Sequence, residues 1–168
     1  MKKKVFFLVG LLMMSGSVFA MPLDKTIISY EPIVMNIALT NGVDSMNSSG
    51  YQIFGFHAGL VWDKLSVNLG FKSLFGDIEV DTGYNIVNND YIVWSAGGRF
   101  SLDSYIYPGF GLSTNVDGLV PINQNVRFDI GLGLAFCLYP TLAIALDLSD
   151  YTCFSFELTP RIGVSIKQ

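Results

Sequence analysis

The chain has 168 residues, of which 51% are hydrophobic and 14% charged, and its formal net charge is -4. This composition is too apolar for a disordered chain. Two cysteines and an acidic balance also exclude a disulfide scaffold and a basic nucleic-acid-binding protein. An average soluble domain carries about 25% charged residues. The classes that remain are a membrane protein and an unusually apolar soluble one.

The N-terminus predicts a secretory signal peptide over residues 1–20. Lys2, Lys3 and Lys4 precede an apolar run over residues 5–14, and small residues close the segment at Ala20. A membrane anchor is the alternative, but ten apolar residues are fewer than the roughly 20 that a spanning helix needs. We therefore expect cleavage near Ala20 and a mature domain over residues 21–168.

Apolar residues after Ala20 recur with a period of two, which is typical of strands with one apolar and one polar face. In residues 126–138, large apolar side chains occupy every even position. The predicted strands, in chain order, cover residues 32–39, 54–62, 65–71, 92–100, 106–112, 126–138, 142–148 and 154–166. The sequence thus predicts an all-β fold with eight antiparallel strands.

The predicted connections alternate in length. Short turns are expected at 63–64, 101–104 and 139–141. Long loops are expected at 40–50, 76–89 and 115–125, with a brief connection at 149–153. Short turns on one rim, long loops on the other and an even strand number are typical of a closed, up-and-down transmembrane barrel of the bacterial outer membrane. Both termini are expected on the short-turn rim.

The composition of the two strand faces decides between a membrane barrel and a soluble one. A soluble barrel would have to place the large apolar residues inside, leaving Gly131, Gly133, Ala135, Ala143 and Ala145 as its water-facing surface. In a membrane barrel the large residues face lipid, and the small ones make room for long polar side chains. The sequence therefore predicts a transmembrane barrel with a polar interior.

Charged residues on the small face are expected to pair in this interior, because an unpaired buried charge is costly. We predict a hydrogen-bonded plug, and a gated ion path is the alternative. The predicted network comprises Lys72, Arg99, Arg127, Asp129, Asp147, Glu157 and Arg161.

This combination of signal peptide, strand number, turn and loop asymmetry and charged core resembles the small eight-stranded outer-membrane barrels, namely the OmpX type and the transmembrane domain of OmpA. The resemblance covers the whole mature chain and is one of pattern, without a diagnostic motif. It implies a closed, monomeric barrel in the outer membrane of a bacterium.

No catalytic or metal site is predicted, and no cofactor. His57 is the only histidine, its parity points inward, and no serine lies near it in sequence, so we interpret it as an interior hydrogen-bonding residue. Cys137 and Cys153 are too few for a metal cluster. The predicted strand order puts them at opposite ends of the barrel, so we expect two free thiols.

The predicted long loops contain acidic residues and no Lys or Arg. Asp77, Glu79 and Asp81 alternate and could present three carboxylates together. A divalent cation bridging them to lipopolysaccharide or a host surface is one interpretation, and solvated loops are the other. Residues 78–87 are predicted to form a hairpin, with its tip at 81–83, that projects beyond the membrane.

The sequence therefore predicts an outer-membrane protein that is structural or mediates surface adhesion or interaction. Its expected partners are outer-membrane lipids, lipopolysaccharide and host surface molecules, and no nucleic acid. One alternative is a narrow channel or a carrier of small hydrophobic molecules. A second alternative is a soluble periplasmic ligand-binding barrel.

Overall fold

A computed structural model describes residues 22–40, 48–52, 55–72, 77–103, 107–139 and 153–168. The predicted signal peptide lies outside these residues. No helix in the described part of the chain is long and apolar enough to cross a membrane.

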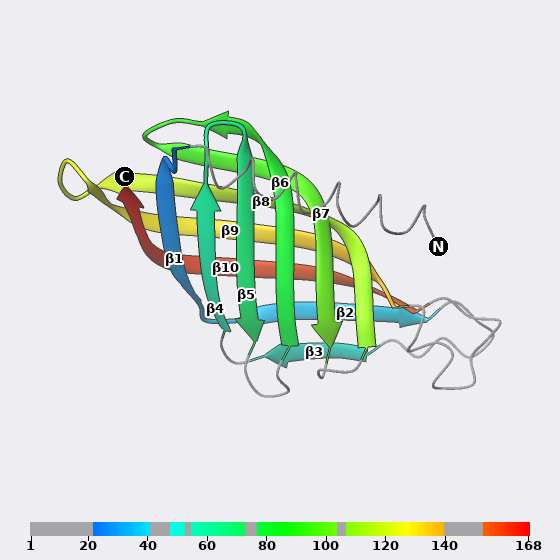
Figure 1. Ribbon diagram of the computed structural model, residues 1–168. Coiled ribbons are helices and arrows are strands. Elements are labelled where there is room, and N and C mark those ends of the chain that lie inside the picture. Colours follow the sequence, from blue (N-terminus) through cyan, green and yellow to red (C-terminus); the bar gives the residue numbers. More distant parts are fainter. Residues whose placement is uncertain (1–21, 41–47, 53–54, 73–76, 104–106, 140–152) are drawn as a thin grey trace, which may run out of the picture.

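The described residues form ten strands. They are β1 (Lys25–Glu31), β2 (Val34–Thr40), β3 (Ser48–Gln52), β4 (Gly55–Val61), β5 (Leu65–Lys72), β6 (Asp77–Asn88), β7 (Ile92–Asp103), β8 (Tyr107–Pro121), β9 (Val126–Leu138) and β10 (Cys153–Lys167). The order β1-β4-β5-β6-β7-β8-β9-β10 is antiparallel throughout, and β10 pairs with β1 to close the ring. In Figure 1, β1 and β4 to β7 form the near wall, and β9 and β10 cross behind them. The predicted closed eight-stranded antiparallel barrel is confirmed.

The first position of the ring is shared by two strands. β10 pairs with β1 through residues 162–167 and with β2 through residues 153–158, while β3 lies beside β2 as β4 lies beside β1. Tyr30 faces Ile162 and Met35 faces Leu158, so residues 31–34 oppose only residues 159–161. This extra residue is a β-bulge at Pro32, which has no N–H to donate. The prediction of a strand over 32–39 therefore found β2 and missed β1.

Two predicted loop segments are strands of the barrel wall. Residues 77–88 form β6, a strand of the wall paired with β5 and β7, and not a projecting hairpin. Residues 115–121 belong to β8 and not to a long loop. The predicted strand over 142–148 lies outside the described residues, and β9 and β10 pair directly from Leu138 and Phe154 to Val126 and Ile166. The predicted number of eight barrel strands is confirmed, although β6 was not among the predicted ones.

Because β6 adds a strand to the predicted order, the strands that follow it run in the opposite direction to the one predicted. One rim, which we call the terminal rim, carries the turns 62–64, 89–91 and 122–125. The start of β1 and the end of β10 also lie there. At the opposite rim, which we call the loop rim, the described strands end at Thr40, Lys72, Asp103 and Leu138. The ends of the barrel, Lys25 and Lys167, do lie on the short-turn rim, but residues 101–103 and Tyr139, predicted there, lie at the loop rim, and residues 104 and 140–141 lie outside the described residues.

Burial follows the predicted faces and is inverted relative to a soluble protein. On the outer surface Leu112 is 69% exposed and Phe56 is 56% exposed, whereas Lys72 inside is 1% exposed and Asp129 is 0% exposed. Aliphatic and aromatic residues cover the outside of every barrel strand from β4 to β10, and the interior is mainly Ser, Asn, Asp, Glu, Lys and Arg. Large residues outside and polar ones inside is the arrangement predicted from the sequence.

Candidate functional site

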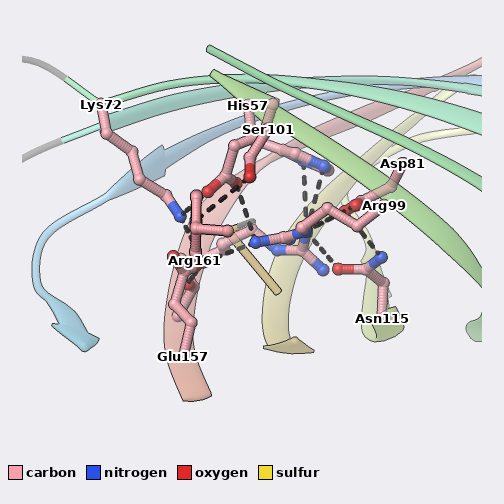
Figure 2. A network of polar contacts seen from close by, with 11 residues as sticks. His57, Lys72, Asp81, Arg99, Ser101, Asn115, Glu157 and Arg161 are labelled. Atoms are coloured by element: carbon pink, nitrogen blue, oxygen red, sulfur yellow. Dashed lines mark hydrogen bonds and ion pairs between the residues drawn. The ribbon is translucent and has the colours of Figure 1, made fainter. Parts of the chain in front are cut away.

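The interior of the barrel holds a continuous polar network, shown in Figure 2. Its side chains come from six strands, because every inward position along a barrel strand faces the same narrow space. Interior glycines provide the room. A Cβ on Gly131 would collide with the Asp117 carboxylate and lie 3.0 Å from Arg161 Nε, and one on Gly55 would lie 2.5 Å from Glu31 Oε2. The small residues on this face are therefore needed to accommodate the charged ones.

Arg99, on β7, is the hub of the half nearer the loop rim. Its Nε and Nη2 donate to the two oxygens of Asp81 at 2.7 and 2.9 Å, forming a bidentate pair. Its Nη1 lies 2.9 Å from Glu79 Oε2 and 2.8 Å from Glu157 Oε1. One guanidinium thus binds three carboxylates, the kind of planar recognition to which arginine is suited.

Lys72, at the end of β5, is the second cation of this half. Its ammonium lies 2.6 Å from Glu79 Oε1 and also contacts Glu157. Thr159 donates a further hydrogen bond to Glu157 Oε1 at 2.9 Å. Glu79 and Glu157 therefore each bind both Lys72 and Arg99, and the four side chains form a closed cluster of alternating charge.

Arg161, on β10, organises the middle of the interior. It donates to Asp117 Oδ1 at 2.9 Å and to Asn115 Oδ1 at 3.0 Å. Its Nη1 also lies 3.1 Å from His57 Nε2. Because a guanidinium only donates, His57 must accept through Nε2 and is therefore neutral in this arrangement. In the described part of the chain His57 is bonded to no hydroxyl or thiol, so the contacts of a catalytic triad are not formed there.

Two buried carboxylates have no ion-pair partner among the described residues. Asp129 accepts one hydrogen bond, from Ser29 Oγ at 2.8 Å, and its Oδ1 has none. Glu31 is 3% exposed, and its Oε2 also has no hydrogen-bond partner. Away from the rims, the buried charges comprise three bases (Lys72, Arg99 and Arg161) and six acids (Glu31, Glu79, Asp81, Asp117, Asp129 and Glu157). The interior is thus short of cations, and each cation must serve several acceptors.

A small apolar layer lies between the centre of this network and the terminal rim. Ile27, Val61, Val93 and Leu119 are at most 3% exposed and form one cluster. They come from β1, β4, β7 and β8, which lie on opposite sides of the ring. The four side chains therefore meet across the interior, beside inward carboxylates: Val93 pairs in register with Asp117, and Leu119 with Asp129.

A polar cap lies between this apolar layer and solvent. Asp90, in the turn 89–91, is 3.1 Å from Arg127 Nη2 and 3.0 Å from Lys167 Nζ. Lys25 donates to Asp24 and Asn88 at 2.7 and 2.6 Å. These contacts join the first and last barrel strands to the β6–β7 turn.

Both rim carboxylates have lowered pKa values. The hydrogen bond from Lys167 lowers the pKa of Asp90. Partial burial acts to raise the pKa of Asp24, but hydrogen bonds from Lys25 and Asn88 outweigh it. A carboxylate with a lowered pKa stabilises the fold above its unfolded-state pKa and loses that contribution as the pH falls through the folded-state value. Acid is therefore expected to loosen this cap.

The predicted network residues divide into three groups. Lys72, Arg99, Glu157 and Arg161 lie in the connected network. Asp129 is buried but unpaired, and Arg127 points inward and then down to the terminal rim. Asp147 lies outside the described residues.

The predicted acidic loop site is not on a loop. Glu79 and Asp81 lie inside the barrel, paired with Lys72 and Arg99. The structure describes the backbone of Asp77 but not its side chain. Asp117, also expected on a loop, is buried beside Arg161. The period-two pattern from Ile78 to Tyr84 could have identified this segment as a strand with Glu79 and Asp81 inside.

The cysteines were wrongly predicted to lie at opposite ends. Cys137 pairs in register with Ser155, two residues from Cys153, so both backbone positions are near the loop rim. Cys137 is a buried, free thiol, and the side chain of Cys153 lies outside the description. The error follows from the predicted strand at 142–148. Within the described ranges, no group of three His, Cys, Asp or Glu residues is arranged to hold a metal ion.

Several solved structures are similar to this chain in fold. Neisserial surface protein A (NspA) is 15% identical, with 85% of this chain and 97% of that chain covered and a TM-score of 0.49. The outer membrane protein OprG from Pseudomonas aeruginosa is 12% identical (88% and 97% covered, TM-score 0.46). Ail, the attachment invasion locus protein of Yersinia pestis, is 12% identical (84% and 98% covered, TM-score 0.40).

No protein-family model and no curated protein matches the sequence. The function of this chain is accordingly inferred from its own geometry.

Proposed function

We propose that the protein spans a bacterial outer membrane as a monomeric, non-conducting barrel with a structural or surface-interaction role. The inverted distribution of side chains carries the proposal. Leaving a Leu or Phe in water forfeits about 1.5 to 3 kcal/mol of burial each, and such residues cover the outer surface. Lipid removes this cost. The closed ring also pairs the strands on both sides, as a hydrocarbon environment requires.

The closed ring supports a monomer, because no strand from a second chain is needed to complete it. The signal peptide predicted over residues 1–20 supports export, and the short turns beside the termini support the orientation usual for such barrels, with the loop rim outside the cell. The polar interior serves as a packed core, and no catalytic role is proposed for it.

The channel alternative is opposed by the side chains that fill the interior, namely the paired charges around Arg99 and Arg161 and the apolar cluster of Ile27, Val61, Val93 and Leu119. We expect the purified protein to give no current steps in planar lipid bilayers, because an eight-stranded barrel is just wide enough for its own side chains. A porin inserted in the same bilayers is the control for detection. Discrete, reproducible openings from the purified chain would support a channel instead.

The surface role is assigned to the loop rim. The connection over residues 139–152 has 14 residues, whereas those on the terminal rim have three or four. Glu79, Asp81 and Asp117 lie in the barrel and are unavailable to a partner, so the proposed contacts with lipopolysaccharide or a host surface fall to the connections themselves. Glu79 and Asp81 are therefore not available to bridge a cation together with Asp77.

Accessibility on intact cells tests location and orientation together. An epitope inserted after Ser45 should be labelled by antibody on intact cells, whereas the same epitope between Asn123 and Gln124 should be labelled only after permeabilisation. A soluble periplasmic barrel would leave both epitopes hidden on intact cells and would be released without detergent. Labelling of the Asn123 insertion alone would reverse the proposed orientation.

A further inference from the structure

The outer wall near the terminal rim contains a groove of about 440 Å³. It crosses three neighbouring strands, β5, β6 and β7, and its lining includes Leu65, Val67, Thr82, Tyr84, Ala96 and Gly97. Leu65 is the first residue of β5 and pairs with Tyr84, so the groove begins directly beside the turn 62–64.

The groove lies where β6 and β7 come close together and carry small outward side chains. Gly83 and Gly97 face each other in register, and a Cβ on Gly97 would lie only 2.5 Å from Gly83 Cα. The outward positions next to them hold the small residues Thr82 and Ala96. Farther along β7 the outward residues include the large Trp94 and Phe100, both exposed. The result is an apolar depression bordered by bulky side chains.

A cation without an ion-pair partner among the described residues lies in the turn next to this groove. Lys64 is exposed and immediately precedes Leu65, and its carbonyl oxygen accepts a hydrogen bond from Asn85 N at 2.9 Å, which holds the turn against β6. The other basic residues of the described chain are each within 4 Å of an acidic group: Lys25, Lys72, Arg99, Arg127, Arg161 and Lys167. Lys64 is the described base without such a partner, in a chain that is acidic as a whole.

We propose that this groove binds one anionic phospholipid from the leaflet at the terminal rim. An acyl chain lies along the bare backbone between Val67 and Ala96, and the phosphate of the headgroup lies against the Lys64 ammonium. This inference rests on the proposed membrane location. The unpaired lysine matches the charged headgroup of such a lipid, and the apolar groove matches its acyl chain.

Lipid retention by the purified full-length barrel, measured by native mass spectrometry from detergent, tests the site. The probes are phosphatidylglycerol and phosphatidylcholine of the same acyl composition. Wild-type protein should retain phosphatidylglycerol about fivefold better, since one lysine near a membrane surface contributes about 1 kcal/mol. Lys64→Gln should abolish this preference.

Filling the groove with a larger side chain tests whether it holds the acyl chain. Ala96→Phe should weaken the retention of both lipids at least about fivefold. Val116→Phe, also on the outer wall but outside the groove, is the matched control and should bind both lipids as wild type does. Each variant is first checked for a folded, heat-sensitive band on electrophoresis.

Unchanged binding by folded Ala96→Phe, or a preference that survives Lys64→Gln, would overturn the site. Equal retention of the two lipids by wild type would overturn it as well. These outcomes leave the membrane location standing if the Ser45 epitope is labelled on intact cells, so failure of the groove and failure of the proposed function are distinguishable.

Discussion

Replacing Arg99 with methionine is expected to lower the free energy of unfolding by about 3 to 5 kcal/mol, the usual cost of removing one partner from a buried ion-pair network. Arg99 binds Glu79, Asp81 and Glu157, all of them buried. After the substitution Asp81 keeps only a 3.4 Å contact from Asn115, and Lys72 remains as the single cation beside the two glutamates. Methionine fills a similar volume, so the expected loss comes from stranded carboxylates and not from a cavity.

Urea unfolding of the protein in lipid vesicles, followed by the electrophoretic mobility of unheated samples, measures this effect. Arg99→Lys keeps the charge but loses the bidentate contact with Asp81 and should fall between wild type and Arg99→Met. Adding Asp81→Asn to Arg99→Met should restore part of the lost stability, because one stranded charge is then removed. If Arg99→Met unfolded at the wild-type urea concentration, the network would not be a stabilising core.

The side-chain faces of this barrel could be predicted from the sequence because the period of a strand is two and does not depend on its partners. Residues 126–138 and 154–166 therefore matched β9 and β10 closely. β1 was missed because the bulge at Pro32 changes the parity in the middle of one wall position. A one-residue insertion exchanges the two faces, and Glu31 then fits neither half of the apparent pattern.

β6 was missed because its inward residues are those of a typical turn. Asp81-Thr82-Gly83 resembles a hairpin tip in water, yet inside a polar barrel an aspartate and a glycine are ordinary wall residues. The pattern also could not give the pairings. Arg99 and Glu157 are 58 positions apart, and their contact follows from the strand order, which the sequence pattern alone predicted wrongly in the middle.

The close approach of β8 to β9 makes Gly111 the most restrictive position for a single added carbon. Gly111 pairs with Cys137, and a Cβ on it would clash with the Phe136 carbonyl oxygen and lie 2.8 Å from Cys137 Cα. Backbone cannot move aside as a flexible side chain does, so the two strands would have to separate. We expect Gly111→Ala to destabilise the barrel by about 3 kcal/mol or more, the upper end of overpacking effects.

Gly98→Ala provides a matched control on the neighbouring strand. Gly98 is exposed on the outer surface, and the nearest atom to its added Cβ is Gly111 O at 3.9 Å, an ordinary contact. The same urea titration should therefore show Gly98→Ala close to wild type and Gly111→Ala shifted to much lower urea or absent from the folded band. Equal midpoints for the two variants would show that β8 and β9 are farther apart at this point than the register of Phe110 with Leu138 and Leu112 with Phe136 requires. Because both substitutions exchange glycine for alanine, the loss of backbone entropy in the unfolded chain cancels, and a difference of several kcal/mol reports the clash at Gly111.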